Sequence, residues 1–149
     1  MNYDLIIVGA GPAGIFTALE LLRGRSGAKI LLIEKGKPVE KRHCPKAETG
    51  KCVNCKPSCA ITTGFSGAGA FSDGKLSLSY EVGGDLPDLI GPMFAQELID
   101  YTDKIYLEFG ADPHVEGIGF GEEIKEIRKN AIKANLKLVD CPIRHLGTE

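Results

Sequence analysis

The chain has 149 residues, the length of one ordinary domain. Hydrophobic residues make up 43% and charged residues 26%, a composition that supports a packed core and argues against disorder. The formal net charge of −2 lacks the basic excess of a general nucleic-acid binder. No hydrophobic run approaches the roughly 18 residues of a membrane span, and the first residues do not resemble a secretory signal, so we expect a cytoplasmic protein that does not enter a membrane.

The first 36 residues predict a strand, a turn, a helix and a second strand. Continuous hydrophobic runs at 5–8 and 30–33 are typical of strands buried on both faces of a parallel sheet. Between them, Pro12 can begin a helix, hydrophobic residues follow at helical spacing, and Gly24 marks its end. This order predicts an α/β fold, a Rossmann-like parallel sheet with flanking helices.

The rest of the chain divides by composition. Residues 37–62 are rich in Lys, Pro and Cys, and residues 63–84 form a Gly/Ser loop. Hydrophobic spacing predicts helices over about 92–109 and 121–135, followed by a strand at 136–139 and a tail.

The turn after the first strand matches the pattern G-x-G-x-x-G. Gly9 permits the tight turn, Gly11 lets the backbone approach a pyrophosphate, and Gly14 lets the helix pack closely on the strand. A diphosphate would lie over the helix N-terminus, where free N–H groups and the helix dipole favour an anion. The predicted cofactor-binding residues of this turn are Gly9, Gly11, Pro12, Ala13 and Gly14.

Glu34 stands 20 residues after Gly14, at the end of the second predicted strand. A carboxylate there can accept hydrogen bonds from the ribose hydroxyls of an adenosine, and it would repel a 2′-phosphate, which disfavours NADP at this site. Lys35 is the next residue and joins the predicted site. The alternative is a tight strand–helix turn followed by a solvated glutamate.

Several segments resemble known flavoproteins. Residues 3–14, with Glu34, Lys35 and Gly36 after the second strand, resemble the N-terminus of FAD-dependent oxidoreductases with two dinucleotide-binding folds. Residues 41–45, 52–55 and 64–76 are similar to a little-characterised group of bacterial and archaeal FAD-dependent dehydrogenases. The similarity covers the first 80 residues well and the rest loosely. It implies FAD at the glycine turn, and places NAD(P), where it serves as a co-substrate at all, elsewhere.

Members of that group are considerably longer than 149 residues. The resemblance therefore implies that residues 1–149 are an N-terminal FAD-binding domain, incomplete and inactive by itself, that includes the Cys-rich segment 37–62 and the Gly-rich loop 63–84.

Four cysteines fall within sixteen residues, at Cys44, Cys52, Cys55 and Cys59. Four thiols this close can surround one ion, and the C-x2-C pair has the spacing of structural zinc sites. An iron–sulfur cluster is a second candidate, but the bacterial ferredoxin run has a shorter first spacing and a final proline, which favours zinc. A redox pair of Cys52 and Cys55, or unligated thiols, are the remaining alternatives.

The glycine-rich segment from Gly64 to Lys75 suggests a backbone that runs close to a flat ligand. In the flavoproteins that it resembles, this loop lies near the flavin ring and the pyrophosphate, and Arg42 would contact the cofactor similarly. A flexible surface loop is the alternative. The residues expected to bind the cofactor here are Arg42, Gly67, Ala68, Gly69, Ser72 and Asp73.

Together these features predict an FAD-dependent oxidoreductase in which this chain supplies the ADP-binding part of the FAD site. The partner would be a small-molecule substrate or electron acceptor; no catalytic residue and no oligomeric state is predicted. Two alternatives stay open: an NAD(P)-binding dehydrogenase domain, and a non-catalytic module that binds nucleotide and metal.

Overall fold

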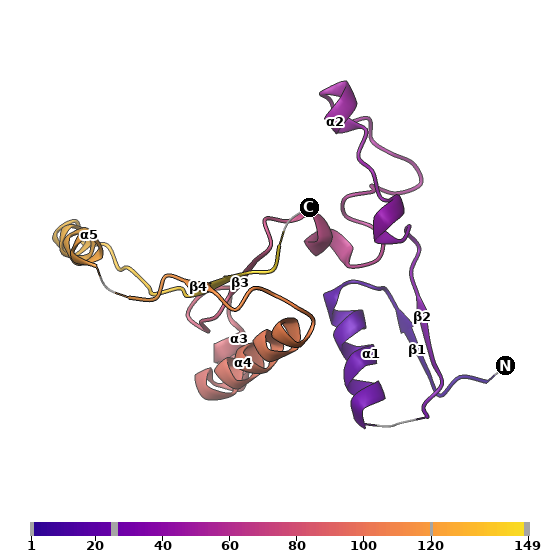
Figure 1. The fold of residues 1–149 in the computed structure, drawn as a ribbon, viewed down its shortest axis with the longest axis horizontal. Coiled ribbons are helices and arrows are strands. Elements are labelled where there is room, and N and C mark those ends of the chain that lie inside the picture. The colour runs from indigo at the N-terminus through magenta and orange to yellow at the C-terminus, as the bar shows by residue number, and fades with distance from the viewer. Residues whose placement is uncertain (1, 25–26, 120, 148–149) are drawn as a thin grey trace. The chain divides into compact units, whose positions relative to one another are not determined.

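The computed structural model describes residues 2–24, 27–119 and 121–147. The chain folds into two compact units, residues 1–72 and residues 73–147. In Figure 1 the first unit runs from indigo to magenta and the second from pink through orange to yellow.

The first unit contains a strand–helix–strand motif. Strands β1 (Leu5–Val8) and β2 (Ile30–Ile33) pair in parallel, in register from Leu5 opposite Ile30 to Val8 opposite Ile33. Helix α1 (Pro12–Gly24) joins them and packs on both strands (Figure 1). The two strands and the helix predicted for residues 5–33 are therefore confirmed, including the helix start at Pro12 and its end at Gly24.

The prediction that both strands are buried on both faces is wrong for the described residues. Val8 is 83% exposed and Ile6 56% exposed. Helix α1 covers one side of a sheet of only two strands, so hydrophobic side chains on the other side stay open. A hydrophobic run predicts a strand, but it does not say which part of a protein covers it.

After β2 the first unit continues with short helical turns linked by loops. A 3-10 turn, η1 (Val39–Lys41), leads to the single helical turn α2 (Lys46–Thr49), which lies at the far end of a long loop (Figure 1). The chain then returns and ends the unit with the 3-10 turn η2 (Gly67–Phe71).

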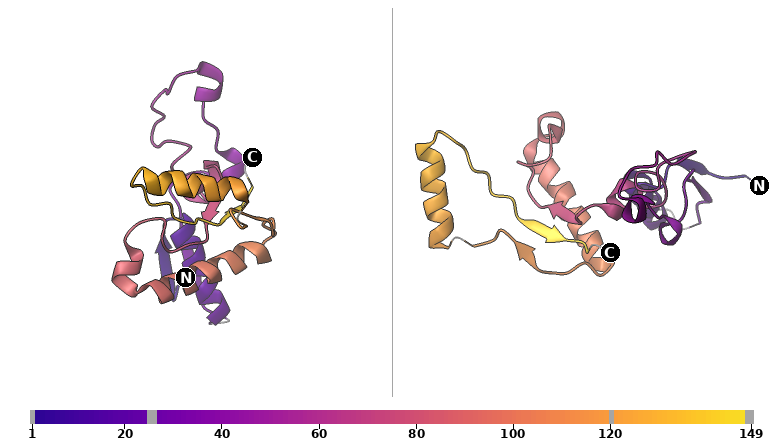
Figure 2. Two further views of the ribbon diagram at one scale, coloured as in Figure 1. Left: turned by 90° about the vertical axis from the view of Figure 1, so that its left-hand side faces the viewer. Right: turned by 90° about the horizontal axis from the view of Figure 1, so that it is seen from above.

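The second unit is built on a small antiparallel sheet of order β3-β5-β4. Figure 2 shows helix α5 set apart from this sheet within the second unit. The elements in chain order are β3 (Lys75–Ser77), α3 (Leu86–Ile90), α4 (Pro92–Glu108), β4 (Val115–Glu116), α5 (Glu122–Lys133) and β5 (Ile143–His145).

The long helices of this unit confirm the helices predicted for 92–109 and 121–135. The strand predicted at 136–139 is wrong: that segment pairs with no strand among the described residues, and the strand forms at β5 instead. The loop predicted for 63–84 contains η2 and β3. Strand β3 escaped prediction because it exists through pairing with β5, which lies almost seventy residues further along the chain.

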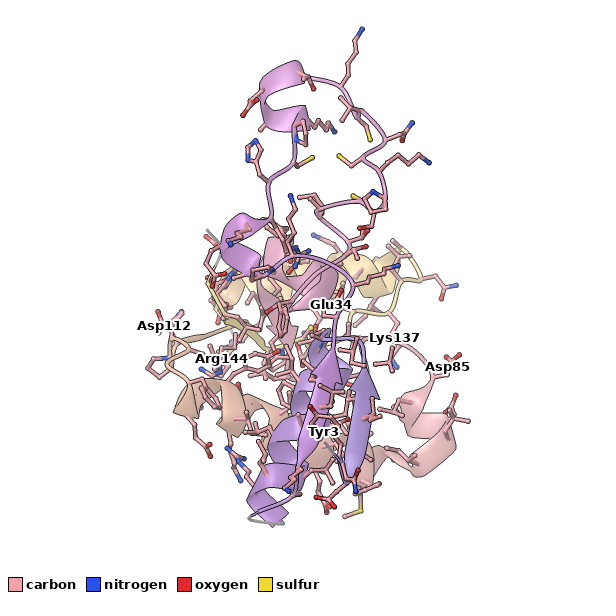
Figure 3. All side chains as sticks on the ribbon, turned by 90° about the vertical axis from the view of Figure 1, so that its right-hand side faces the viewer. Tyr3, Glu34, Asp85, Asp112, Lys137 and Arg144 are labelled. Atoms are coloured by element: carbon pink, nitrogen blue, oxygen red, sulfur yellow. The ribbon has the colours of Figure 1, made fainter. Side chains whose placement is uncertain are left out.

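Arg144 of β5 is a buried charged residue of the second unit, at 5% exposure. Its Nη2 donates to Oδ2 of Asp103 on α4 over 2.8 Å, and its Nη1 donates to the carbonyl of Asp112 over 2.9 Å. The pKa of the Arg144 guanidinium is raised, chiefly by the hydrogen bonds that it donates to the Asp103 carboxylate. Arg144 thus connects strand β5 to helix α4 through Asp103. Figure 3 labels Arg144 and Asp112.

In the part of the chain that the structure describes, none of the helices has both the length and the hydrophobicity to cross a membrane.

Candidate dinucleotide-binding site

The glycine turn between β1 and α1 forms a tight, open corner. Gly9 has φ +106°, a conformation that favours glycine, and its N–H donates to the carbonyl of Ile33 over 2.7 Å. A Cβ on Gly14 would lie 2.0 Å from the carbonyl oxygen of Gly9, so the close approach of helix and turn needs glycine there. A Cβ on Gly11 would meet no atom within 4 Å, which leaves space beside its backbone.

Glu34 follows β2 and points back to this corner. Its Oε2 accepts a hydrogen bond from the N–H of Ala10 over 2.9 Å, and its Oε1 accepts one from the N–H of Gly36 over 2.8 Å. These bonds, that to Ala10 foremost, lower the pKa of the Glu34 carboxyl and keep it ionised. Figure 3 shows Glu34 at the upper end of the parallel strands, where a carboxylate with remaining lone pairs can accept hydroxyl donors.

A third backbone segment reaches the same corner from η2. The N–H of Ser66 donates to the carbonyl of Ala10 over 2.8 Å. A Cβ on Gly67 would lie 3.2 Å from Cα of Gly11 and 3.4 Å from Cδ of Pro12. The structure therefore brings the two glycine-rich segments together, as the sequence predicts.

Two further glycines make this arrangement possible. A Cβ on Gly36 would lie 2.4 Å from the N atom of Gly64, and a Cβ on Gly64 would lie 2.5 Å from the carbonyl oxygen of Lys37. The N–H of Phe65 also donates to that carbonyl over 3.1 Å. This crossing was not predicted from the sequence. The signal for it is Gly36, which directly follows Glu34 and Lys35.

Arg42 donates hydrogen bonds to the backbone at the end of the long loop that carries α2 and to the backbone just before η2. It is 5% exposed, and its Nε donates to the carbonyl of Ala60 over 2.8 Å. Its two terminal nitrogens donate to the carbonyls of Ile61 and Phe65, and its guanidinium lies 4.7 Å from the centre of the Phe71 ring. Its position makes it a residue that fixes the loops; its predicted contact with the cofactor stays a prediction.

The remaining predicted residues lie in the following places. Pro12 and Ala13 open α1, Lys35 is exposed beside Glu34, and Ala68 and Gly69 lie in η2. Ser72 Oγ donates to the carbonyl of Gly69 over 2.9 Å.

Asp73 belongs to the second unit, where Nζ of Lys75 lies 3.1 Å from its Oδ2 and lowers its pKa. Within the first unit, the structure brings Gly9, Gly11, Pro12, Gly14, Glu34, Gly67 and Gly69 together at the glycine turn.

The four clustered cysteines lie away from the glycine turn, in the long loop that carries α2. Cys44, Cys52, Cys55 and Cys59 all line one pocket of about 390 Å³. Within the described residues, no three His, Cys, Asp or Glu side chains are close enough together to hold an ion as placed. The pKa of the Cys59 thiol is lowered, first by the backbone N–H of Thr62 and then by that of Ile61.

The class of protein follows from the parallel strand–helix–strand motif and its glycine corner. A tight turn, an open helix N-terminus and an acid after the second strand together define a Rossmann-like dinucleotide-binding domain.

The family model of the pyridine nucleotide-disulphide oxidoreductases matches residues 3–138, and the chain belongs to this family. Its members are FAD- and NAD(P)-dependent oxidoreductases.

Two further comparisons bear on the chain. A protein of Clostridium beijerinckii described as an uncharacterized protein is 43% identical over 72 residues, which are 48% of this chain. The matched segment spans 13% of the length of that relative. No solved structure matches the chain.

Proposed function

We propose that this chain forms the ADP-binding part of an FAD site in an oxidoreductase. The adenosine ribose would bind Glu34, and the pyrophosphate would lie across the N-terminus of α1, beside Gly11. The observation that supports this proposal best is the Glu34 carboxylate, held at the glycine corner by the N–H of Ala10 over 2.9 Å.

The residues present fit this half of the cofactor. The backbone of Gly11 has open space beside it, so a diphosphate can approach the free N–H groups of the first helical turn. The Glu34 carboxyl has a lowered pKa and stays anionic at neutral pH, as an acceptor for two vicinal ribose hydroxyls must. The same charge repels a 2′-phosphate.

FAD is favoured over NAD by the second glycine-rich segment. Gly67 and Gly69 bring backbone to the N-terminus of α1, beside Gly11 and Pro12, and an NAD site built from the turn and the acid alone leaves this segment unexplained. When bound, FAD would supply hydride acceptance at its N5, while the protein supplies position and electrostatics. The substrate and the electron acceptor would be small molecules.

Binding titrations test this proposal directly. The protein is titrated with FAD, ADP, NAD⁺ and NADP⁺, and binding is followed by flavin fluorescence or by calorimetry. We expect FAD to bind and ADP to compete with it, while NADP⁺ does not compete. Tight NAD⁺ binding without FAD binding would instead support the dehydrogenase alternative, and ADP binding without FAD binding would support a non-catalytic nucleotide module.

A further inference from the structure

The four cysteines between Arg42 and Ala60 lie in a part of the molecule that the dinucleotide site does not use. We call residues 43–59 the cysteine lobe. Arg42 closes the base of the lobe, because its side chain donates to the carbonyls of Ala60 and Ile61, just after the lobe ends. Figure 3 shows sulfur atoms (yellow) of this lobe directed toward the inside of the loop.

The lobe has no hydrophobic core of its own. None of its residues is buried, its one large hydrophobic side chain, Val53, is 52% exposed, and its single helical turn, α2, spans four residues. A segment of this size gains little stability from hydrophobic burial, so an ion bound by its thiols would order it.

The thiols are arranged around one space. All four line the same pocket of about 390 Å³, together with Lys46 and Lys56. Asn54 has φ +48° and divides the C-x2-C pair, and its Oδ1 accepts a weak hydrogen bond from Sγ of Cys52 over 3.7 Å. Cys52 and Cys55 both line the pocket, and their C-x2-C spacing is that of a zinc knuckle.

A tetrahedral ion would require the pocket to contract. With Zn–S bonds of about 2.3 Å, neighbouring sulfur atoms stand about 3.8 Å apart, and no three possible ligands among the described residues are grouped to hold an ion as placed. No packed side chains occupy the interior of the lobe, so closure around an ion meets little steric resistance. Metal binding and ordering of the lobe would then be coupled, as in small metal-dependent domains.

The charge of the lobe suits an anionic centre. Residues 43–59 carry three basic side chains (Lys46, Lys51 and Lys56) against one acid, Glu48, and Lys41 and Arg42 directly precede them. Four thiolates around Zn²⁺ leave a net charge of −2, which these residues offset, and basic surroundings favour the thiolate form.

We infer that Cys44, Cys52, Cys55 and Cys59 bind one Zn²⁺ as a tetrathiolate site that folds the cysteine lobe. Binding of Zn²⁺ to four thiols releases four protons and changes no oxidation state. Zinc is favoured over an iron–sulfur cluster because seven residues precede the C-x2-C pair and Ala60, not proline, follows the last cysteine. The inference is independent of which dinucleotide the glycine corner takes.

Elemental analysis of the protein purified under reducing, anaerobic conditions tests the inference. We expect one zinc per chain in the unmodified protein, and most of it lost in C44S, C52S, C55S and C59S. The matched control is C141S, because Cys141 lies outside the lobe and contacts Ser77 Oγ over 3.5 Å; this variant is expected to keep its zinc. The far-UV circular dichroism of all variants reports whether the rest of the fold survives.

Cobalt titration of the metal-free unmodified protein gives a result that does not depend on any variant folding. One equivalent of Co²⁺ is expected to produce the intense visible bands of tetrahedral thiolate coordination, and Zn²⁺ is expected to abolish them. Iron with acid-labile sulfide, a disulfide between lobe cysteines after anaerobic purification, or four thiols that titrate freely without binding metal would each overturn the inference.

Discussion

At the scale of single residues, the Glu34 carboxylate fixes the backbone of the glycine corner and is also the proposed acceptor for the ribose hydroxyls. Each oxygen already accepts a backbone N–H, from Ala10 and from Gly36, so the side chain shapes the glycine corner before any ligand arrives. Its remaining lone pairs are those that ribose hydroxyls would use. A substitution at Glu34 therefore affects both the corner and the ligand.

E34Q is expected to weaken FAD binding at least about tenfold, because it removes the charge from the acceptor and leaves one of the two backbone donors facing an amide NH₂. Fluorescence titration with FAD measures the effect. E40Q, at an exposed glutamate on η1, is the matched control and should bind FAD normally. Equal affinity of E34Q and the unmodified protein would contradict the ribose assignment.

The lowered pKa of Glu34 also predicts a pH dependence of stability. A carboxyl whose folded pKa lies below its unfolded value, about 4.3 for glutamate, stabilises the fold fully above that value. Its contribution disappears as pH falls through the lowered folded pKa. Denaturant melts from pH 7 to pH 3 should therefore show that the stability difference between the unmodified protein and E34Q shrinks toward acid pH; a constant difference would argue against the shift.

Gly14 offers a residue-scale test of packing alone. G14A is expected to destabilise the first unit by about 1–3 kcal/mol, although alanine favours helices, because its Cβ would lie 2.0 Å from the carbonyl oxygen of Gly9. G24A in the same helix is the matched control, since its Cβ would meet no atom within 4 Å. Denaturant unfolding compares the two, and similar stabilities would show that the corner relaxes freely.

At the scale of elements, the sequence predicts best what is local. The hydrophobic runs of β1 and β2, and Pro12 with Gly24 around α1, are short-range signals, and each element forms where they predict it. Strands β3 and β5 were missed because their formation depends on each other across the second unit. The hydrophobic pattern of residues 136–139 is typical of a strand. In the described structure this segment is exposed and forms no β-strand pairing.

The candidate site divides in the same way. The placement of Gly9, Gly14 and Glu34 at one corner could be predicted because a fixed spacing within one motif brings them together. The crossing of Gly36 over Gly64 and the anchoring by Arg42 could not be predicted, because each depends on a loop returning to a point that no local pattern specifies.

Arg42 joins η1 to the backbone of residues 60–65, and R42A is expected to destabilise the first unit by about 2–4 kcal/mol. Truncation would leave the carbonyls of Ala60, Ile61 and Phe65 without their charged donor. Denaturant unfolding measures the loss, and faster limited proteolysis within 43–59 would locate it. K41A, at the adjacent exposed lysine, should change neither result.

At the scale of the whole molecule, the division into two compact units predicts independent unfolding. D103N removes the charge partner of Arg144 in the second unit and is expected to lower only the transition of that unit. G14A should lower only the transition of the first unit. Calorimetry combined with hydrogen exchange read by mass spectrometry assigns each transition to its residues; a single transition that both variants shift equally would show that the units unfold together.

The anchoring by Arg42 has a consequence for the architecture of the chain. Because residues 42 and 60 are held together at the base, the seventeen residues between them form a detour that begins and ends at nearly the same place. Such an excursion can be shortened, exchanged or grafted onto another scaffold without rerouting the backbone around the nucleotide corner. The cysteine lobe is in this sense a removable module, so its removal need not disturb the strand–helix–strand framework.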